Sequence, residues 1–115
     1  MSIAQVSVAG GAVGELPGAS YSFQLSPEDK RTLARLFLET SHEDLLVLEH
    51  ALQGSDFGEV LHRVHRLHGA ALTVGATPLV AQLESFERTL HEARQIPADS
   101  HERLARLRRD LHNYQ

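Results

Sequence analysis

Two histidines and a glycine lie close together in the helical segment His65-Arg66-Leu67-His68-Gly69-Ala70-Ala71. At about 100° per residue, His65 falls at the rim of the helix's apolar stripe, roughly 100° from its centre, whereas His68 falls roughly 40° from it. A neutral imidazole is a nucleophile near pH 7. Because a rim position supports the ring and leaves its tip accessible, the segment predicts a reactive histidine at position 65, with His68 partly buried beside it.

Gly69 lies one turn beyond His65 and roughly 40° from it around the helix. A glycine in a helix interior costs about 1 kcal/mol relative to alanine, so its presence needs a reason. Without a side chain it leaves space through which another protein can approach. We expect such a partner to dock on the exposed side of this helix, with His62, Arg66 and Ala70 as contacts.

Metal binding is an alternative, because His62, His65 and His68 recur every three residues. His62 and His68 are about 120° apart around the axis, however, which is too spread for one tetrahedral centre. We therefore predict no metal site and keep a histidine-based metal-binding bundle as a minor alternative. The scattered histidines are interpreted as solvated surface positions: His42, His50, His91, His101 and His112. Glu87 and Glu92 are interpreted as solvated helix-surface charges and not as a catalytic carboxylate pair.

Length and composition indicate one all-α domain. The chain has 115 residues, 42% of them hydrophobic and only 5% aromatic, which suits a helical bundle. The absence of cysteine excludes disulfides and thiolate chemistry. A net charge of −4 argues against general nucleic-acid binding. The basic last helix is interpreted as a solvated face carrying Arg103, Arg106, Arg108 and Arg109. No apolar run reaches the length of a membrane span, so we expect a soluble chain.

Residues 1–24 are rich in Gly, Ser and Ala without helical periodicity, which predicts a flexible linker or tail before a bundle at 25–115. Ser26-Pro27 has the form of a helix start. A break or kink is expected near Thr40-Ser41, giving an extra N-terminal helix or a kinked first helix. The apolar face of this first segment is predicted to comprise Leu33, Leu36 and Phe37.

Helix ends follow from caps and glycines. Gly54 is expected to end a helix, and Asp56 with Glu59 three residues on predicts a capping box. The next helix should end near Val74-Gly75, and Thr77-Pro78 looks like another cap followed by proline. The last helix is expected to be capped by Asp99 or Ser100. Short connections between amphipathic helices favour an antiparallel up-down four-helix bundle.

The segment from His65 to Ala71, followed by Gly75-Ala76 and then by Leu79, Leu83 and Phe86-Glu87, resembles the signature of histidine-containing phosphotransfer (HPt) domains. The similarity spans about Leu61 to Glu92. More narrowly, Phe37-Leu38-Glu39-Thr40 through Asp44-Leu45 is similar to the HPt modules at the C-termini of hybrid sensor kinases of the Bvg and Evg type. In such a kinase, residues 1–24 would tether the module to a preceding receiver domain.

The resemblance implies a phosphorelay intermediate and not a complete enzyme. His65 would accept a phosphoryl group from a receiver-domain aspartyl phosphate and pass it to a response-regulator aspartate. The receiver would supply the aspartate, a lysine and Mg²⁺, so no cofactor is expected in this domain. The isolated domain is expected to be a cytoplasmic monomer without nucleic-acid or membrane contact, at the cytoplasmic end of an inner-membrane kinase if it belongs to one.

The chain departs from the family pattern at two positions. His68 stands where the family usually has a lysine that is thought to hold the phosphoryl oxygens, and a protonated imidazole would restore that charge. Leu83 replaces a frequent cysteine, which is interpreted as a core exchange. The change at His68 keeps open a second function, a helical docking module that is not phosphorylated.

Overall fold

The computed structural model describes residues 25–114, which form four α-helices and contain no strand. The helices are α1 (Pro27–Gln53), α2 (Phe57–Val74), α3 (Thr77–Ala93) and α4 (Ser100–His112). The predicted all-α class is confirmed for this part of the chain, while the predicted linker at 1–24 lies outside it. The chain divides into two units after Arg31, and the described core lies in the second, residues 32–115.

The helix break predicted at Thr40-Ser41 is wrong, because α1 continues through both residues, so residues 27–53 form one helix and not two. Ser41 is buried and lies one turn from Phe37 and one turn from Leu45, so the three share one inward face. A small hydroxyl residue fits within this stripe without ending the helix. At the helix start the expected cap is confirmed, since the Ser26 hydroxyl accepts the backbone N–H of Asp29 at 3.0 Å.

Only one of the three residues predicted as the first apolar face is buried. Phe37 packs edge-on against Tyr114, with ring centroids 5.2 Å apart, whereas Leu33 and Leu36 are exposed. The core begins at Phe37, whose partner Tyr114 lies two residues beyond the end of α4. Sequence periodicity marks the apolar side of a helix but does not reveal where the neighbouring helices stop.

The caps of α2 follow the sequence in part. Asp56 accepts the backbone N–H of Glu59 at 3.2 Å, as predicted. The reciprocal half of the capping box is not formed, because the Glu59 carboxylate accepts from Arg63 and the Asp56 N–H donates to the Ala51 carbonyl. Gly75 ends the helix with φ of 74°, a left-handed conformation that glycine adopts without a steric penalty.

The two later helix starts lack the side-chain caps that the sequence suggested. Ala76 is the N-cap of α3, and the Thr77 hydroxyl donates to the Gly75 carbonyl instead. Asp99 is the N-cap of α4, but its carboxylate accepts from Arg103. The proline near the start of α3 and buried apolar residues on both helices are sufficient to set these starts.

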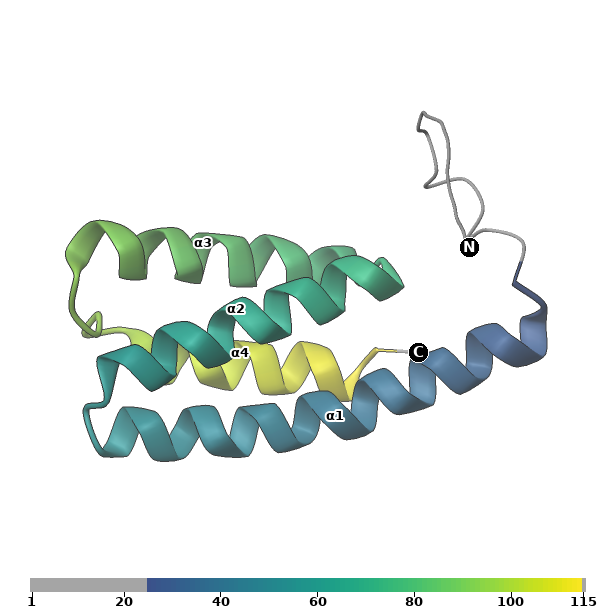
Figure 1. Ribbon diagram of the computed structural model, residues 1–115, viewed down its shortest axis with the longest axis horizontal. Helices are drawn as coiled ribbons and strands as arrows, with labels where there is room; N and C mark the ends of the chain where they lie inside the picture. Colours follow the sequence, from purple (N-terminus) through teal and green to yellow (C-terminus); the bar gives the residue numbers. More distant parts are fainter. Residues whose placement is uncertain (1–24, 115) are drawn as a thin grey trace, which may run out of the picture. The chain divides into compact units, whose positions relative to one another are not determined.

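The core is a stripe of buried apolar residues from each helix. In the part of the chain after Arg31, α2 packs on α3 and α3 packs on α4, and the chain reverses direction at each short connection (Figure 1). The stripes of α2 and α3 comprise Val60, Val64, Leu67, Ala71, Leu79, Leu83, Phe86 and Leu90. None of the described helices has the length and apolar character needed to cross a bilayer.

A buried carboxylate links α1 to α2. The Asp44 side chain is 5% exposed, and its Oδ1 accepts from Arg63 Nη1 at 2.9 Å. Arg63 also donates to Glu59 at 2.7 Å, and Arg66 Nε lies 3.6 Å from the other Asp44 oxygen. Because a charge removed from water needs a partner, these contacts fix α2 against α1 at this point.

Arg63→Met should lower the free energy of unfolding by about 2 kcal/mol, since it leaves the buried Asp44 carboxylate with only a long contact to Arg66. Chemical denaturation at pH 7 measures the change. The matched control is Arg88→Met on the exposed face of α3, which should change stability by less than about 0.5 kcal/mol. Equal losses in the two variants would contradict the role given to the Asp44–Arg63 pair.

Candidate functional site

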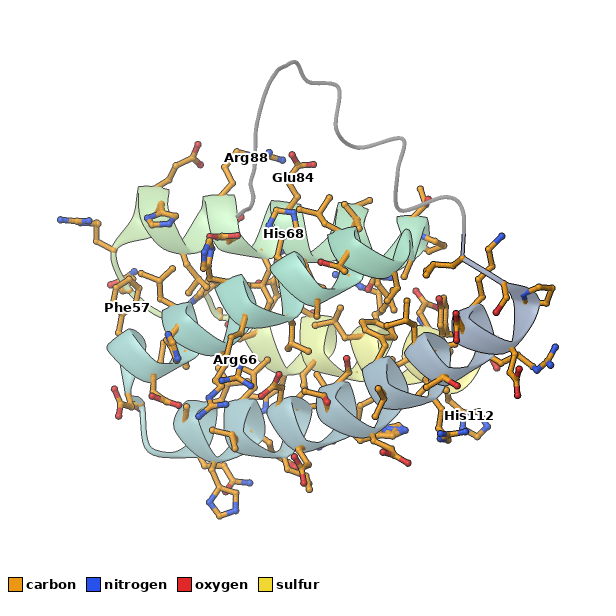
Figure 2. All side chains as sticks on the ribbon, turned by 45° about the vertical axis from the view of Figure 1, so that its right-hand side comes forward. Phe57, Arg66, His68, Glu84, Arg88 and His112 are labelled. Atoms are coloured by element: carbon orange, nitrogen blue, oxygen red, sulfur yellow. The ribbon has the colours of Figure 1, made fainter. Side chains whose placement is uncertain are left out.

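Two histidines of α2 meet one carboxylate of α3. His65 Nδ1 lies 2.6 Å from one oxygen of Glu87, and His68 Nδ1 lies 2.9 Å from the other. The packing of the two apolar stripes sets this register, because Glu87 directly follows Phe86, one of the most buried residues of α3. Figure 2 shows His68 at the seam between α2 and α3. The site is therefore built by both helices.

The three side chains differ in their access to solvent. The His65 side chain is 74% exposed, whereas those of His68 and Glu87 are 18% and 16% exposed. The predicted positions of His65 at the rim and His68 partly inside are both seen. An accessible ring is thus held at one nitrogen by a carboxylate that is itself largely shielded.

The hydrogen bonds define which nitrogen of His65 is free. An ionised carboxylate only accepts hydrogen bonds, so both Nδ1 atoms must carry a proton and donate to Glu87. In the neutral ring of His65, the lone pair then lies on Nε2. Neither Nε2 has a hydrogen-bond partner within residues 25–114. Nε2 of His65 is therefore an exposed nucleophilic nitrogen, and the hydrogen bond from Nδ1 to Glu87 fixes the orientation of the His65 ring.

Electrostatics favour the ionised form of Glu87. Burial acts to raise the pKa of this carboxyl, but the hydrogen bonds from His65 and His68 and their positive charge together outweigh it, so the pKa is below its ordinary value. His91 Nε2 lies 3.9 Å from the same carboxylate. Glu87 thus remains an acceptor across the neutral pH range.

The interpretation of Glu87 as a helix-surface charge was wrong, whereas Glu92 is exposed as expected. The helical periodicity of α2 does not predict the contact with Glu87, because this contact depends on the rotation of α3 about its own axis relative to α2. The sequence feature that could indicate this contact is the position of Glu87 directly after Phe86, at the edge of the apolar stripe of α3. His42, His50, His91, His101 and His112 are exposed, as predicted.

The space over Gly69 is open. A Cβ added to this glycine would meet no atom within 4 Å apart from its own helix backbone and chain neighbours. Leu72 follows one turn later, is 57% exposed, and lies roughly 20° from His65 around the helix. Leu72 is not among the predicted docking residues, although helical periodicity places it on this side of α2. An exposed imidazole, an open turn and an exposed leucine therefore follow one another along α2.

The three predicted docking residues do not form one patch with His65. His62 is exposed, but Ala70 is half-buried against the core. Arg66 is half-exposed and lies on the side of α2 that faces α1, where it contacts Asp44 (Figure 2). The structure brings together His65, His68 and Gly69 of the predicted site and directs Arg66 away from them. Within residues 25–114, no group of three His, Cys, Asp or Glu side chains is arranged to hold a metal ion.

Glu87→Gln tests the electrostatic role of the carboxylate. Because its folded-state pKa is below the ordinary value of 4.5, ionised Glu87 stabilises the fold above about pH 4.5 and loses this effect as the pH falls through the folded-state pKa. At pH 6 the variant should be less stable by about 1 kcal/mol, and near pH 3 the difference should vanish. Thermal unfolding measures both, with Glu92→Gln as the exposed control. A difference that persists at pH 3 would contradict this assignment.

Comparison with known proteins identifies the family of the chain. The family model of the Hpt domain matches residues 32–115, most of the chain. Searches of curated proteins and of solved structures gave no match. Hpt domains act in phosphorelays, where they carry phosphoryl groups on histidine and interact with receiver domains and response regulators. They are carrier modules and not classical enzymes. The chain belongs to the Hpt domain family.

Proposed function

We propose that His65 accepts a phosphoryl group from the aspartyl phosphate of a receiver domain and passes it to the aspartate of a response regulator. One observation carries this assignment: the ring is 74% exposed, yet its Nδ1 is held 2.6 Å from the shielded Glu87 carboxylate. The other ring nitrogen, Nε2, is the atom that takes the phosphoryl group. His68 and Gly69 support it, the first beside Glu87 and the second by leaving the approach open.

The transfer uses few groups of this chain. The Nε2 lone pair forms a bond to phosphorus while the bond between phosphorus and the aspartyl oxygen breaks, and that electron pair returns to the aspartate as a carboxylate. The reverse exchange delivers the group to the next aspartate. Glu87 holds the Nδ1 proton throughout, so the ring is positioned without reorganisation. The receiver would provide the aspartate, the lysine and Mg²⁺.

Receiver docking would use the side of α2 on which His65, Gly69 and Leu72 follow one another. An exposed leucine beside an open turn offers an apolar contact, since burying it against a partner releases water from its surface. His62 would contribute at the polar rim. Arg66 would contribute only where a partner also reaches toward α1, because its guanidinium lies near Asp44.

The wider context is part of the same proposal. Residues 25–115 would be an antiparallel up-down HPt bundle, and residues 1–24 a linker to a preceding receiver domain. The module would then act at the cytoplasmic end of a hybrid sensor kinase of the Bvg and Evg type. The resemblance in the stretch from Phe37 to Leu45 supports this placement.

Incubation with a phosphorylated receiver domain tests the assignment of His65. The native chain should take up label that is stable in alkali and labile in acid, and His65→Gln should take up none. His101→Gln removes an exposed histidine on α4 and should still be labelled. Label in His65→Gln, or none in the native chain, would refute the proposal and leave the unphosphorylated docking module as the better account.

Substitution of Gly69 separates docking from stability. Gly69→Ala should raise the free energy of unfolding by about 1 kcal/mol, because the added Cβ meets nothing and alanine favours the helix. Gly69→Trp should slow phosphoryl transfer at least about tenfold by blocking the approach while leaving the helix content unchanged.

Ala105→Trp is the matched control for that experiment, since Ala105 is exposed on α4. It should transfer at the native rate. Circular dichroism and single-turnover transfer from a phosphorylated receiver measure the two effects. Native transfer by Gly69→Trp would show that no close approach occurs there.

A further inference from the structure

His68 is a further unusual residue of the site, because of its residue type and its contact with Glu87. It stands where the HPt pattern that this sequence resembles usually has lysine, and its Nδ1 donates to the same carboxylate that holds His65. Its Nε2 has no hydrogen-bond partner among the described residues. Lysine has a fixed charge near neutral pH, whereas the charge of an imidazole depends on one proton. The substitution therefore makes the charge at this position dependent on proton binding.

We propose that phosphorylation of His65 is coupled to uptake of one proton at Nε2 of His68, with Glu87 as the positioning residue that holds both rings. The inference rests on the proposed function of His65. It adds that this carrier binds a proton when it gains a phosphoryl group and releases the proton when it passes the group on. A lysine at position 68 would be protonated before and after transfer and would bind no additional proton.

Geometry and charge carry this coupling. His65 and His68 are three residues apart on one helix face and are hydrogen-bonded to the two oxygens of one carboxylate. The phosphoryl group carries roughly two negative charges. Because Nδ1 of His65 keeps its proton, the phosphorylated His65 ring carries one positive charge, so the net change beside His68 is about one negative charge. A negative charge within about 4–6 Å favours the protonated form of an imidazole. Because the His68 side chain is only 18% exposed, solvent screens this attraction incompletely.

The protons and bonds balance in each step. In the neutral form of the two rings, both Nδ1–H groups donate to Glu87 and each Nε2 carries a lone pair. As the bond between His65 Nε2 and phosphorus forms, the aspartyl oxygen takes the electron pair of the broken bond, and the His65 ring, still protonated at Nδ1, becomes an imidazolium cation. A proton from water binds His68 Nε2, and the resulting N–H can donate to a phosphoryl oxygen. Transfer to the next aspartate reverses the steps and returns the proton to water.

Other charged groups near His68 come from the two helices that form the seam. Glu87 contacts it directly, and His91 reaches Glu87 at 3.9 Å. Glu84 and Arg88 lie on the same part of α3, where Figure 2 labels them near His68, and both are exposed. The titratable or charged groups at this seam are His65, His68, Glu84, Glu87, Arg88 and His91. His68 is less exposed than His65. Solvent therefore screens His68 only weakly from the charge of the phosphoryl group on His65.

Side-chain NMR of the full chain tests proton uptake directly. The imidazole ¹⁵N signals are followed from pH 5 to pH 9 in the free chain and in the chain phosphorylated by a receiver domain. In the phosphorylated chain, His68 should bind its proton at higher pH than in the free chain, while the exposed His101 on α4 should titrate identically in both. An unchanged His68 in a chain phosphorylated at His65 would overturn the coupling and leave the proposed function intact.

Transfer rates give a second, independent readout. The ratio of the native rate to that of His68→Lys should fall about tenfold from pH 6 to pH 8.5, because lysine keeps its charge over this range while a histidine loses it. Using the ratio cancels the pH dependence of His65 and of the receiver, which both proteins share. Circular dichroism checks that His68→Lys is folded.

His68→Gln separates charge from hydrogen bonding. This variant keeps a donor but has no titratable group, so its rate relative to His68→Lys should not change with pH. A ratio of native to lysine rates that is constant with pH overturns the proposal even though His65 is labelled. A chain in which His65 takes no label overturns the proposed function and the coupling together.

Discussion

One largely shielded carboxylate, at the seam of two helices, connects the candidate site to the fold. Glu87 reaches from α3 to two imidazoles of α2, at 2.6 Å and 2.9 Å, and these contacts exist only when the two helices are packed in register. The contacts orient both rings by the same nitrogen and leave the opposite nitrogen of each free. A surface histidine without such a partner would rotate among several orientations.

The packing that holds this register is apolar on the inside and ionic at one edge. Phe86 and Leu90 of α3 are fully buried in the shared core with Val60 and Val64 of α2. On the other side of α2, the shielded Asp44 binds Arg63 and ties this helix to α1. Because α2 is fixed on both sides, His65 is accessible on a helix that has little freedom to shift. Rigid support and exposure of the reacting ring are thus compatible.

Sequence patterns predicted much of this arrangement and missed the part that depends on tertiary packing. The wheel of α2 placed His65 at the rim and His68 partly inside, and the open turn at Gly69 followed from residue type alone. Glu87 was misread because no pattern within α3 shows which way the helix faces its neighbour. The break expected near Thr40-Ser41 does not form, because the small side chain of Ser41 fits the inward stripe of a continuous α1. The helical spacing of Leu33 and Leu36 predicts core positions for both, but the core begins after them.

The central claim is that the exposed Nε2 of His65 is the atom that carries the phosphoryl group. Two-dimensional NMR that correlates ³¹P with the imidazole signals identifies the nitrogen bonded to phosphorus in the native chain after reaction with a phosphorylated receiver. The account predicts one phosphorus signal coupled to Nε2 of His65, with Nδ1 still protonated and bonded to Glu87. Phosphorus bonded to Nδ1, or to any other histidine of the chain, would contradict it.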